Sequence, residues 1–203
     1  SRAVSVAYIV RALCQLGWMP TPGEAVAAET LADRLGIAAQ YHRWLASVCK
    51  ELTADELTSN ADPNDVWKVA WDEFPECQAE LMLMRTCGEQ LAAVLRGEAD
   101  PLNLIFPEGA LTTAEALYQD SPSFRFNNLL VQKTIAEVVG RLPKGKALRI
   151  LEIGGGTGGT TNFILPILPD HCTEYVFTDI SQRYTTHAQH RFAQFPFFRV
   201  ETL

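Results

Sequence analysis

Lysine and arginine never form a run in this sequence, and no Cys-x-x-Cys or Cys/His spacing of a metal site occurs. A formal net charge of −7 disfavours a chain that coats nucleic acid or anionic lipid. The five cysteines are scattered and odd in number, so we expect buried, reduced thiols instead of a disulfide framework. Residues 1–18 contain arginines and offer neither a membrane span nor a signal peptide. These absences predict a cytoplasmic protein without metal, nucleic-acid or membrane partners.

Enough apolar sequence is present for a core, since 47% of the 203 residues are hydrophobic. Residues 1–108 show helical periodicity, interrupted by Gly17, Gly36 and a turn around Pro63. Within them, residues 27–52 have the outline of a helix-turn-helix, but its second helix offers few cations for phosphates. We therefore expect a helical subdomain used for packing or as a lid, and not for DNA binding.

The pattern changes near residue 102. Residues 114–142 predict a loop followed by a helix, and short strands are expected at 147–154, 174–181 and 197–203, with helices at 160–168 and 182–195 between them. Alternating helices and strands are typical of a doubly wound parallel sheet. The expected fold class is thus α/β, with a helical unit over residues 1–108 and a partial Rossmann-like sheet over residues 109–203.

Five glycines occupy six positions between Gly154 and Gly159, directly after the first expected strand. Such bare backbone indicates that a ligand approaches the main chain, and the parallel sheet brings Asp179, at the end of the next strand, to the same edge. The loop fits two templates. Positions 154, 156 and 159 spell the GxGxxG of dinucleotide enzymes, and positions 152, 154, 156 and 158 spell the ExGxGxG of S-adenosylmethionine enzymes.

Charge favours the second template without excluding the first. A dinucleotide presents a pyrophosphate to a helix N-terminus, whereas S-adenosylmethionine has no phosphate and carries an ammonium and a sulfonium. Glu152 supplies a carboxylate for those cations, and Asp179 suits the ribose hydroxyls of either ligand. Both acids also have purely structural interpretations, as the end of a strand and the cap of a helix.

The segments at residues 148–161, 174–181 and 195–203 resemble the C-methyltransferase domain of polyketide synthases, as do residues 80–109 and 117–128. The likeness is specific from about Glu80 to Ser181, and residues 1–60 match only as a helical lid. It implies an S-adenosylmethionine-dependent enzyme that works beside other synthase domains. Such an enzyme methylates the α-carbon of a β-ketoacyl chain on an acyl carrier protein, after a base has removed the α-proton. The residues that match the family's motifs are Glu152, Gly154, Gly156 and Gly158 for the cofactor loop, Asp179 for the ribose, and Tyr118 for the lining of the cofactor or substrate pocket.

The sequence departs from the family in two respects. Residues 154–156 are Gly-Gly-Gly where Gly-Ala-Gly is common, which we expect to leave the ligand contact possible. The family's catalytic histidine–acid pair and the acid that meets adenine have no match up to Leu203. The catalytic residue is therefore unassigned, and we expect the 203 residues alone to be inactive.

Other histidines do not replace the missing base. His187 and His190 lie on the helix after the second strand and are expected to be ordinary helix residues, and His42 and His171 lack metal or triad spacing. The alternatives are a pseudo-methyltransferase with a structural or docking role in a synthase, a small-molecule methyltransferase, and a nicotinamide enzyme.

Overall fold

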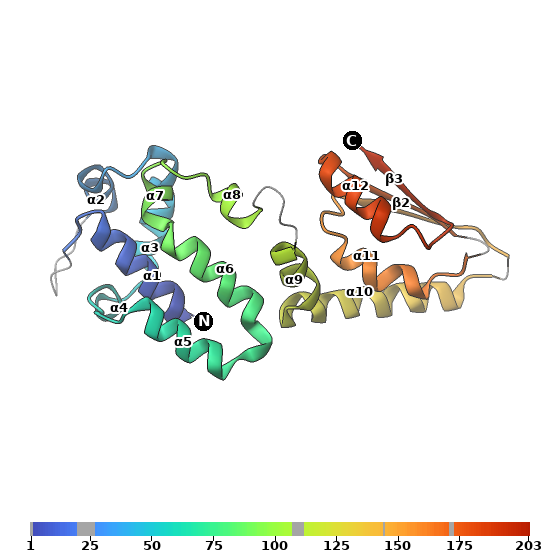
Figure 1. Ribbon diagram of the computed structural model, residues 1–203, viewed down its shortest axis with the longest axis horizontal. Coiled ribbons are helices and arrows are strands. Elements are labelled where there is room, and N and C mark those ends of the chain that lie inside the picture. Colours follow the sequence, from blue (N-terminus) through green and yellow to red (C-terminus); the bar gives the residue numbers. More distant parts are fainter. Residues whose placement is uncertain (1, 20–26, 107–111, 144, 171–172) are drawn as a thin grey trace. The chain divides into compact units, whose positions relative to one another are not determined.

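The computed structural model describes residues 2–19, 27–106, 112–143, 145–170 and 173–203. The chain divides into two compact units, residues 1–110 and residues 111–203. The first unit is helical and the second combines helices with a small sheet (Figure 1). The switch from helices to alternating helices and strands, predicted from the sequence, is confirmed. The role of a lid for residues 1–108 stays a prediction.

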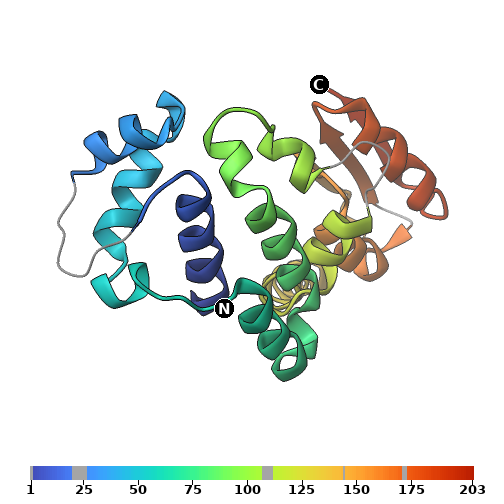
Figure 2. The same ribbon diagram turned by 60° about the vertical axis from the view of Figure 1, so that its left-hand side comes forward.

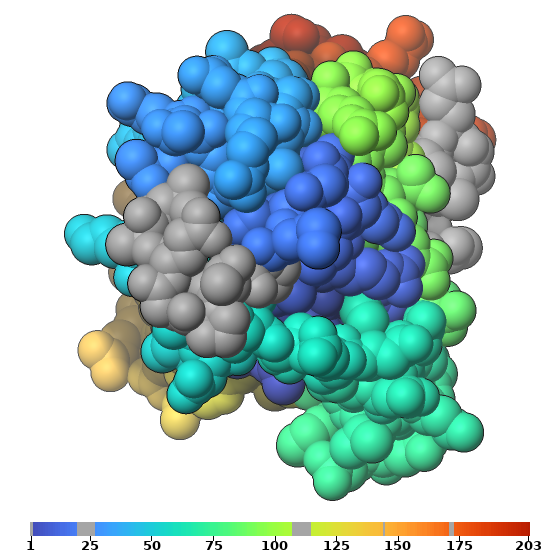
Figure 3. All heavy atoms as spheres, turned by 90° about the vertical axis from the view of Figure 1, so that its left-hand side faces the viewer, coloured from blue at the N-terminus to red at the C-terminus, as the bar shows by residue number. Residues whose placement is uncertain are grey.

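The first unit is built around helix α1, which lies among the other helices of this unit in Figure 2. Its buried side chains join two apolar clusters, one with α2, α3 and α7 and one with α5 and α6. Figure 3 shows the outer surface of this unit, where side chains of α1 are flanked by those of α2 and α5. The described helices are α1 (Arg2–Gln15), α2 (Ala28–Leu35), η1 (Ala39–Tyr41), α3 (His42–Glu51), α4 (Ala54–Leu57), α5 (Pro63–Glu73), η2 (Pro75–Cys77), α6 (Gln78–Glu89), α7 (Leu91–Leu95) and α8 (Pro101–Ile105).

The second unit contains three parallel strands in the order β1-β2-β3. Its elements are α9 (Thr112–Asp120), α10 (Pro122–Arg141), β1 (Leu148–Ile153), α11 (Gly159–Ile164), η3 (Leu165–Ile167), β2 (Thr173–Asp179), α12 (Gln182–Arg191) and β3 (Phe198–Thr202). The predicted open parallel sheet is confirmed. The loop predicted before α10 is wrong, because residues 112–120 form α9. Residues 114–117 of α9, Ala-Glu-Ala-Leu, are good helix formers, and Pro122 at the first position of α10 separates the two helices.

One face of the sheet is packed, and the other is exposed at β1 but covered at Thr178 of β2. Tyr175 and Phe177 of β2 are buried with Ile164, Leu165 and Phe192 from the helices. Leu151 and Ile153, which alternate with the packed side chains of β1, are exposed. The register pairs Glu152 with Phe177 and Asp179 with Thr202, so the loop after β1 and the acid of β2 meet at the carboxyl edge.

The expectation of buried cysteines is wrong in part. Cys14 is exposed, and Cys49, Cys77 and Cys87 are half-buried free thiols. Cys14 follows the buried Leu13 and therefore turns toward the other side of α1. Cys172 and His171 lie outside the described residues. Within the described ranges, the helices are too short or too polar to cross a bilayer, and no cluster of three metal-binding side chains occurs.

Candidate cofactor site

The loop between β1 and α11 adopts a backbone that suits glycine. Gly154, Gly156 and Gly158 have φ angles of 70°, 56° and 76°, in the left-handed region. A Cβ atom added at Gly154 or Gly156 would meet no atom within 4 Å. These two residues therefore border open space, where a ligand can lie against the backbone.

The remaining glycines of the loop are required by contacts inside the protein. A Cβ atom at Gly155 would lie 2.1 Å from the ring of Phe177, and one at Gly158 would lie 2.7 Å from Phe192. At Gly159 it would lie 2.9 Å from the carbonyl oxygen of Tyr118. Packing thus explains three of the five glycines, and the left-handed backbone explains Gly154 and Gly156, whose open side leaves room for a ligand.

The carboxylate of Asp179 fastens this loop to the end of β2. Its Oδ2 accepts a hydrogen bond from the Gly156 N–H at 2.9 Å, and its Oδ1 accepts one from the Ser181 N–H at 2.8 Å. The residue is 7% exposed. Each oxygen retains a lone pair for a further donor. The acid is thus fixed beside the open part of the loop, in the position predicted from the sequence.

Two apolar or aromatic side chains near Asp179 were missed by the sequence reasoning. Ile180 follows Asp179 and is 83% exposed. Tyr184 lies on the first turn of α12, where burial and the nearby Asp179 raise its pKa, partly opposed by Arg183. An exposed isoleucine between two polar residues is a weak sequence signal, and it gains meaning only beside the loop.

Glu152 points its Oε2 atom toward the packed face of the sheet. That atom accepts hydrogen bonds from Thr161 Oγ1 at 2.6 Å and from the Tyr175 hydroxyl at 2.9 Å. Burial raises the pKa of Glu152 although both hydroxyl bonds oppose the shift, and burial beside this acid also raises the pKa of Tyr175. The hypothesis that Glu152 meets an ammonium group therefore depends on its other oxygen.

Tyr118 lies on α9, next to the start of α11. Its carbonyl oxygen accepts a hydrogen bond from Asn128 Nδ2 at 3.0 Å, and its ring packs edge-on against Phe124 with centroids 4.8 Å apart. Asn128 is buried and also accepts a hydrogen bond from Thr160 Oγ1 at 2.8 Å. The sequence reasoning missed Asn128, whose only signal is a polar residue beside an apolar stretch. Tyr118, the loop and Asp179 thus gather at one end of the sheet.

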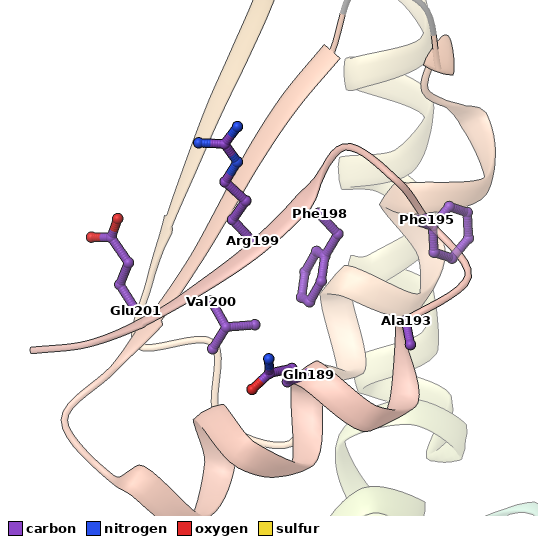
Figure 4. Close-up of a pocket in the computed structure, with 7 residues that line it drawn as sticks. All are labelled: Gln189, Ala193, Phe195, Phe198, Arg199, Val200 and Glu201. Carbon is purple, nitrogen blue, oxygen red and sulfur yellow. The ribbon is translucent and has the colours of Figure 1, made fainter.

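A separate hollow of about 480 Å³ lies between α12 and β3. Figure 4 shows Phe198 and Val200 on the side of β3 that faces α12, with Arg199 and Glu201 on its other side, and all four residues contribute to the lining. It does not include the glycine loop or Asp179. Because this hollow contains none of the predicted site residues, the carboxyl edge of the sheet remains the candidate cofactor site.

A helical N-terminal region precedes an open parallel sheet that has a glycine loop after the first strand and an acid at the end of the second, an arrangement typical of Rossmann-like folds. Solved structures of carbon methyltransferases match this fold. No protein-family model matches the chain. The non-reducing polyketide synthase nvfA of Aspergillus novofumigatus is 30% identical across 99% of this chain. The synthase mapC of Penicillium roqueforti is 38% identical over 138 residues, 65% of this chain. The chain spans 10% and 6% of the lengths of these two synthases.

Solved structures agree. The CurJ carbon methyltransferase superposes with a TM-score of 0.87 at 37% identity, over 98% of this chain and 57% of that one. The C-methyltransferase (CMeT) domain of the citrinin polyketide synthase gives 0.79 at 27% identity, over 99% and 57%. The trans-methyltransferase CalH, solved with SAH, shares the fold at a TM-score of 0.60 and 19% identity, over 98% and 55%. Sequence and fold together confirm that the chain is similar to the C-methyltransferase domains of polyketide synthases.

Proposed function

We propose that this chain forms the cofactor-binding half of a polyketide synthase C-methyltransferase. The complete domain would transfer a methyl group from S-adenosylmethionine to the α-carbon of a β-ketoacyl chain on an acyl carrier protein. The observation that carries the proposal is the carboxyl edge of the sheet, where open space beside Gly154 and Gly156 lies next to the carboxylate of Asp179. Similarity to carbon methyltransferases in sequence and fold supports it.

The loop amides favour a ligand without phosphate. The N–H of Gly155 donates to the Thr178 carbonyl at 2.9 Å, that of Gly158 donates to the Gly155 carbonyl at 2.9 Å, and that of Gly156 donates to Asp179. A pyrophosphate is normally held by loop and helix N–H groups that have no other acceptor. Since three of these donors are already satisfied inside the protein, the S-adenosylmethionine template fits the loop better than the dinucleotide template.

When bound, S-adenosylmethionine supplies an electrophilic methyl group. In this proposal Asp179 accepts hydrogen bonds from the ribose hydroxyls through its remaining lone pairs. Ile180 offers an exposed apolar face to the adenine ring, and Tyr118 and Tyr184 border the same space. The residue that removes the α-proton is not assigned to this chain.

Titration with S-adenosylhomocysteine (SAH) and, separately, with NADH tests the proposal. Amide NMR shifts detect millimolar binding and report its place in the chain. We expect shifts at residues 154–158 and 179–184 with SAH and smaller ones with NADH. Preferential NADH binding would contradict the proposal. Binding of neither ligand, by this chain or by a longer synthase domain that contains it, would favour the structural or docking role instead.

A further inference from the structure

Helices α9 and α12 meet through two pairs of residues that are four positions apart. Glu115 and Gln119 share a face of α9, and His187 and Arg191 share a face of α12. Arg191 Nη1 lies 3.4 Å from Glu115 Oε1, and Nη2 donates to Gln119 Oε1. His187 Nε2 lies 2.5 Å from the same Glu115 oxygen but without the alignment of a hydrogen bond. The position of His187 on a helix is as predicted, whereas its acidic neighbour was not foreseen.

Arg191 also reaches the glycine loop. Its Nη1 donates to the carbonyl oxygen of Thr157 at 3.0 Å. The side chains of Arg191 and Glu115 are only 23% and 24% exposed, so water screens their interaction less than that of a surface pair. The planar fork of arginine carries donors on separate nitrogen atoms, so it reaches acceptors that lie apart on two segments, whereas the three donors of lysine diverge from one nitrogen atom and do not reproduce that spacing.

These contacts hold α9 from one side, and Asn128 holds it from another. Asn128 Nδ2 binds the carbonyl of Tyr118, the residue before Gln119, while Arg191 binds the Gln119 side chain. The Tyr118 carbonyl in turn lies directly over Gly159, with no room for a Cβ atom between them. The orientation of α9 therefore decides where Tyr118 lies relative to the loop.

We infer that Arg191 is a positioning residue of the cofactor site. It ties α9 to the Thr157 carbonyl and thereby keeps Tyr118 beside the glycine loop. This inference rests on the proposed function, because it gives Tyr118 and the loop a shared ligand. In this inference Arg191 acts through Tyr118, since its hydrogen bonds go to Glu115, Gln119 and Thr157.

SAH affinity, measured by amide shift titration, tests the inference in four proteins: the unaltered chain, Arg191→Gln, Arg191→Lys and the control Arg141→Gln. Arg141 is an arginine of the same unit whose side chain is 83% exposed and pairs with Glu137 on its own helix. Loss of charged hydrogen bonds should weaken SAH binding about tenfold in Arg191→Gln. The SAH affinity of Arg191→Lys should lie between those of Arg191→Gln and the unaltered chain. Arg141→Gln should bind SAH as tightly as the unaltered chain. Thermal unfolding of each variant shows that the protein under titration is folded.

A double-substitution cycle with Tyr118→Ala separates positioning from a general loss of stability. If Arg191 acts through Tyr118, Arg191→Gln should weaken binding by less than about twofold in the Tyr118→Ala protein, since coupled residues are not additive. Equal losses with and without Tyr118, or full affinity in Arg191→Lys or Arg191→Gln, would overturn the inference alone. Absence of SAH binding both by the unaltered chain and by a longer synthase domain that contains it would overturn the proposed function and the inference with it.

Discussion

Two structural features at position 158, the backbone conformation and the space beside it, together require glycine. Its φ of 76° lies in the left-handed region, and a Cβ atom would stand 2.7 Å from Cε2 of Phe192. Phe192 is 2% exposed and belongs to the core of the second unit, so its ring has little room to move. We therefore predict that Gly158→Ala destabilises this unit.

The magnitude follows from the two terms. A left-handed backbone costs an L-residue about 1–2 kcal/mol, and overpacking a core costs about 1–3 kcal/mol. Loss of glycine entropy in the unfolded chain offsets about 0.4–1 kcal/mol. The net loss is about 1–5 kcal/mol, and a middle value of about 3 kcal/mol lowers a urea midpoint by on the order of 2 M for a unit of this size.

The chain contains its own internal standard for this measurement. All four tryptophans, residues 18, 44, 67 and 71, lie in the first unit, so tryptophan fluorescence reports that unit alone. Amide NMR signals of β1, β2 and β3 report the second unit. We expect Gly158→Ala to shift the strand signals to lower urea and to leave the fluorescence transition in place.

A matched substitution and a suppressor sharpen the comparison. Gly140 on α10 has open space around its Cβ position and no positive φ, so Gly140→Ala should be neutral or slightly stabilising. Adding Phe192→Leu to Gly158→Ala should restore part of the lost stability, because it removes the clash between the new Cβ atom and the Phe192 ring. The strain of the left-handed backbone at position 158 should remain. An unchanged strand midpoint in Gly158→Ala would refute the reasoning.

Three further predictions concern chemistry. If the Asp179 carboxylate binds the ribose, Asp179→Ala should weaken SAH binding by about 1.5–3 kcal/mol in calorimetry. The control Asp170→Ala, at an exposed position, should leave the affinity unchanged. Equal SAH affinities of the two variants would remove Asp179 from the site. Burial raises the pKa of Glu152 above its ordinary value of 4.5, so its stabilising contribution is present below that pH and is lost as the pH rises through the folded-state pKa. Glu152→Gln should flatten this part of the stability profile of the second unit in urea titrations at several pH values, and an unchanged slope would contradict it. Finally, we expect no methylated product by mass spectrometry when the 203-residue chain is incubated with S-adenosylmethionine and a β-ketoacyl carrier protein. General-base catalysis raises a reaction rate by about 10²–10⁴-fold, and no base is assigned to this chain. Turnover would contradict this prediction and would direct mutagenesis to Tyr118, His187 and His190.

The parts of the fold that were predicted from the sequence have local causes. Short apolar runs around Ile150 and Phe177 specify the strands, and Gly154 to Gly159 mark the turn between strand and helix. The register of parallel strands then places Asp179 beside the loop without knowledge of any side-chain contact. These elements needed only periodicity and the rule that ligand loops lie at the carboxyl ends of strands.

The parts that were missed depend on contacts between distant segments. Arg191 and Glu115 are separated by 76 positions, and the partners of Asn128 lie on α9 and α11. Nothing in the local sequence distinguishes Arg191 from other helix arginines. The helix α9 was mistaken for a loop because Ser121 and Pro122 dominate the pattern there, although they separate two helices.

Glu152 and Asp179 show why the candidate site could be predicted only in part. Both acids stand at the carboxyl ends of adjacent strands, and sequence reasoning gave both a role toward the ligand. The register and the two-residue alternation place both on the packed face, but Asp179 is the last residue of β2 whereas Glu152 lies one residue before the end of β1, so different segments surround them. Asp179 receives two backbone N–H groups from the loop and the following turn, which fix it beside the open space. Glu152 receives two hydroxyl groups from the packed face, where burial favours its neutral form. A spacing motif specifies the positions of two carboxylates, but the burial and the hydrogen-bond donors that each one meets depend on how distant segments fold around it.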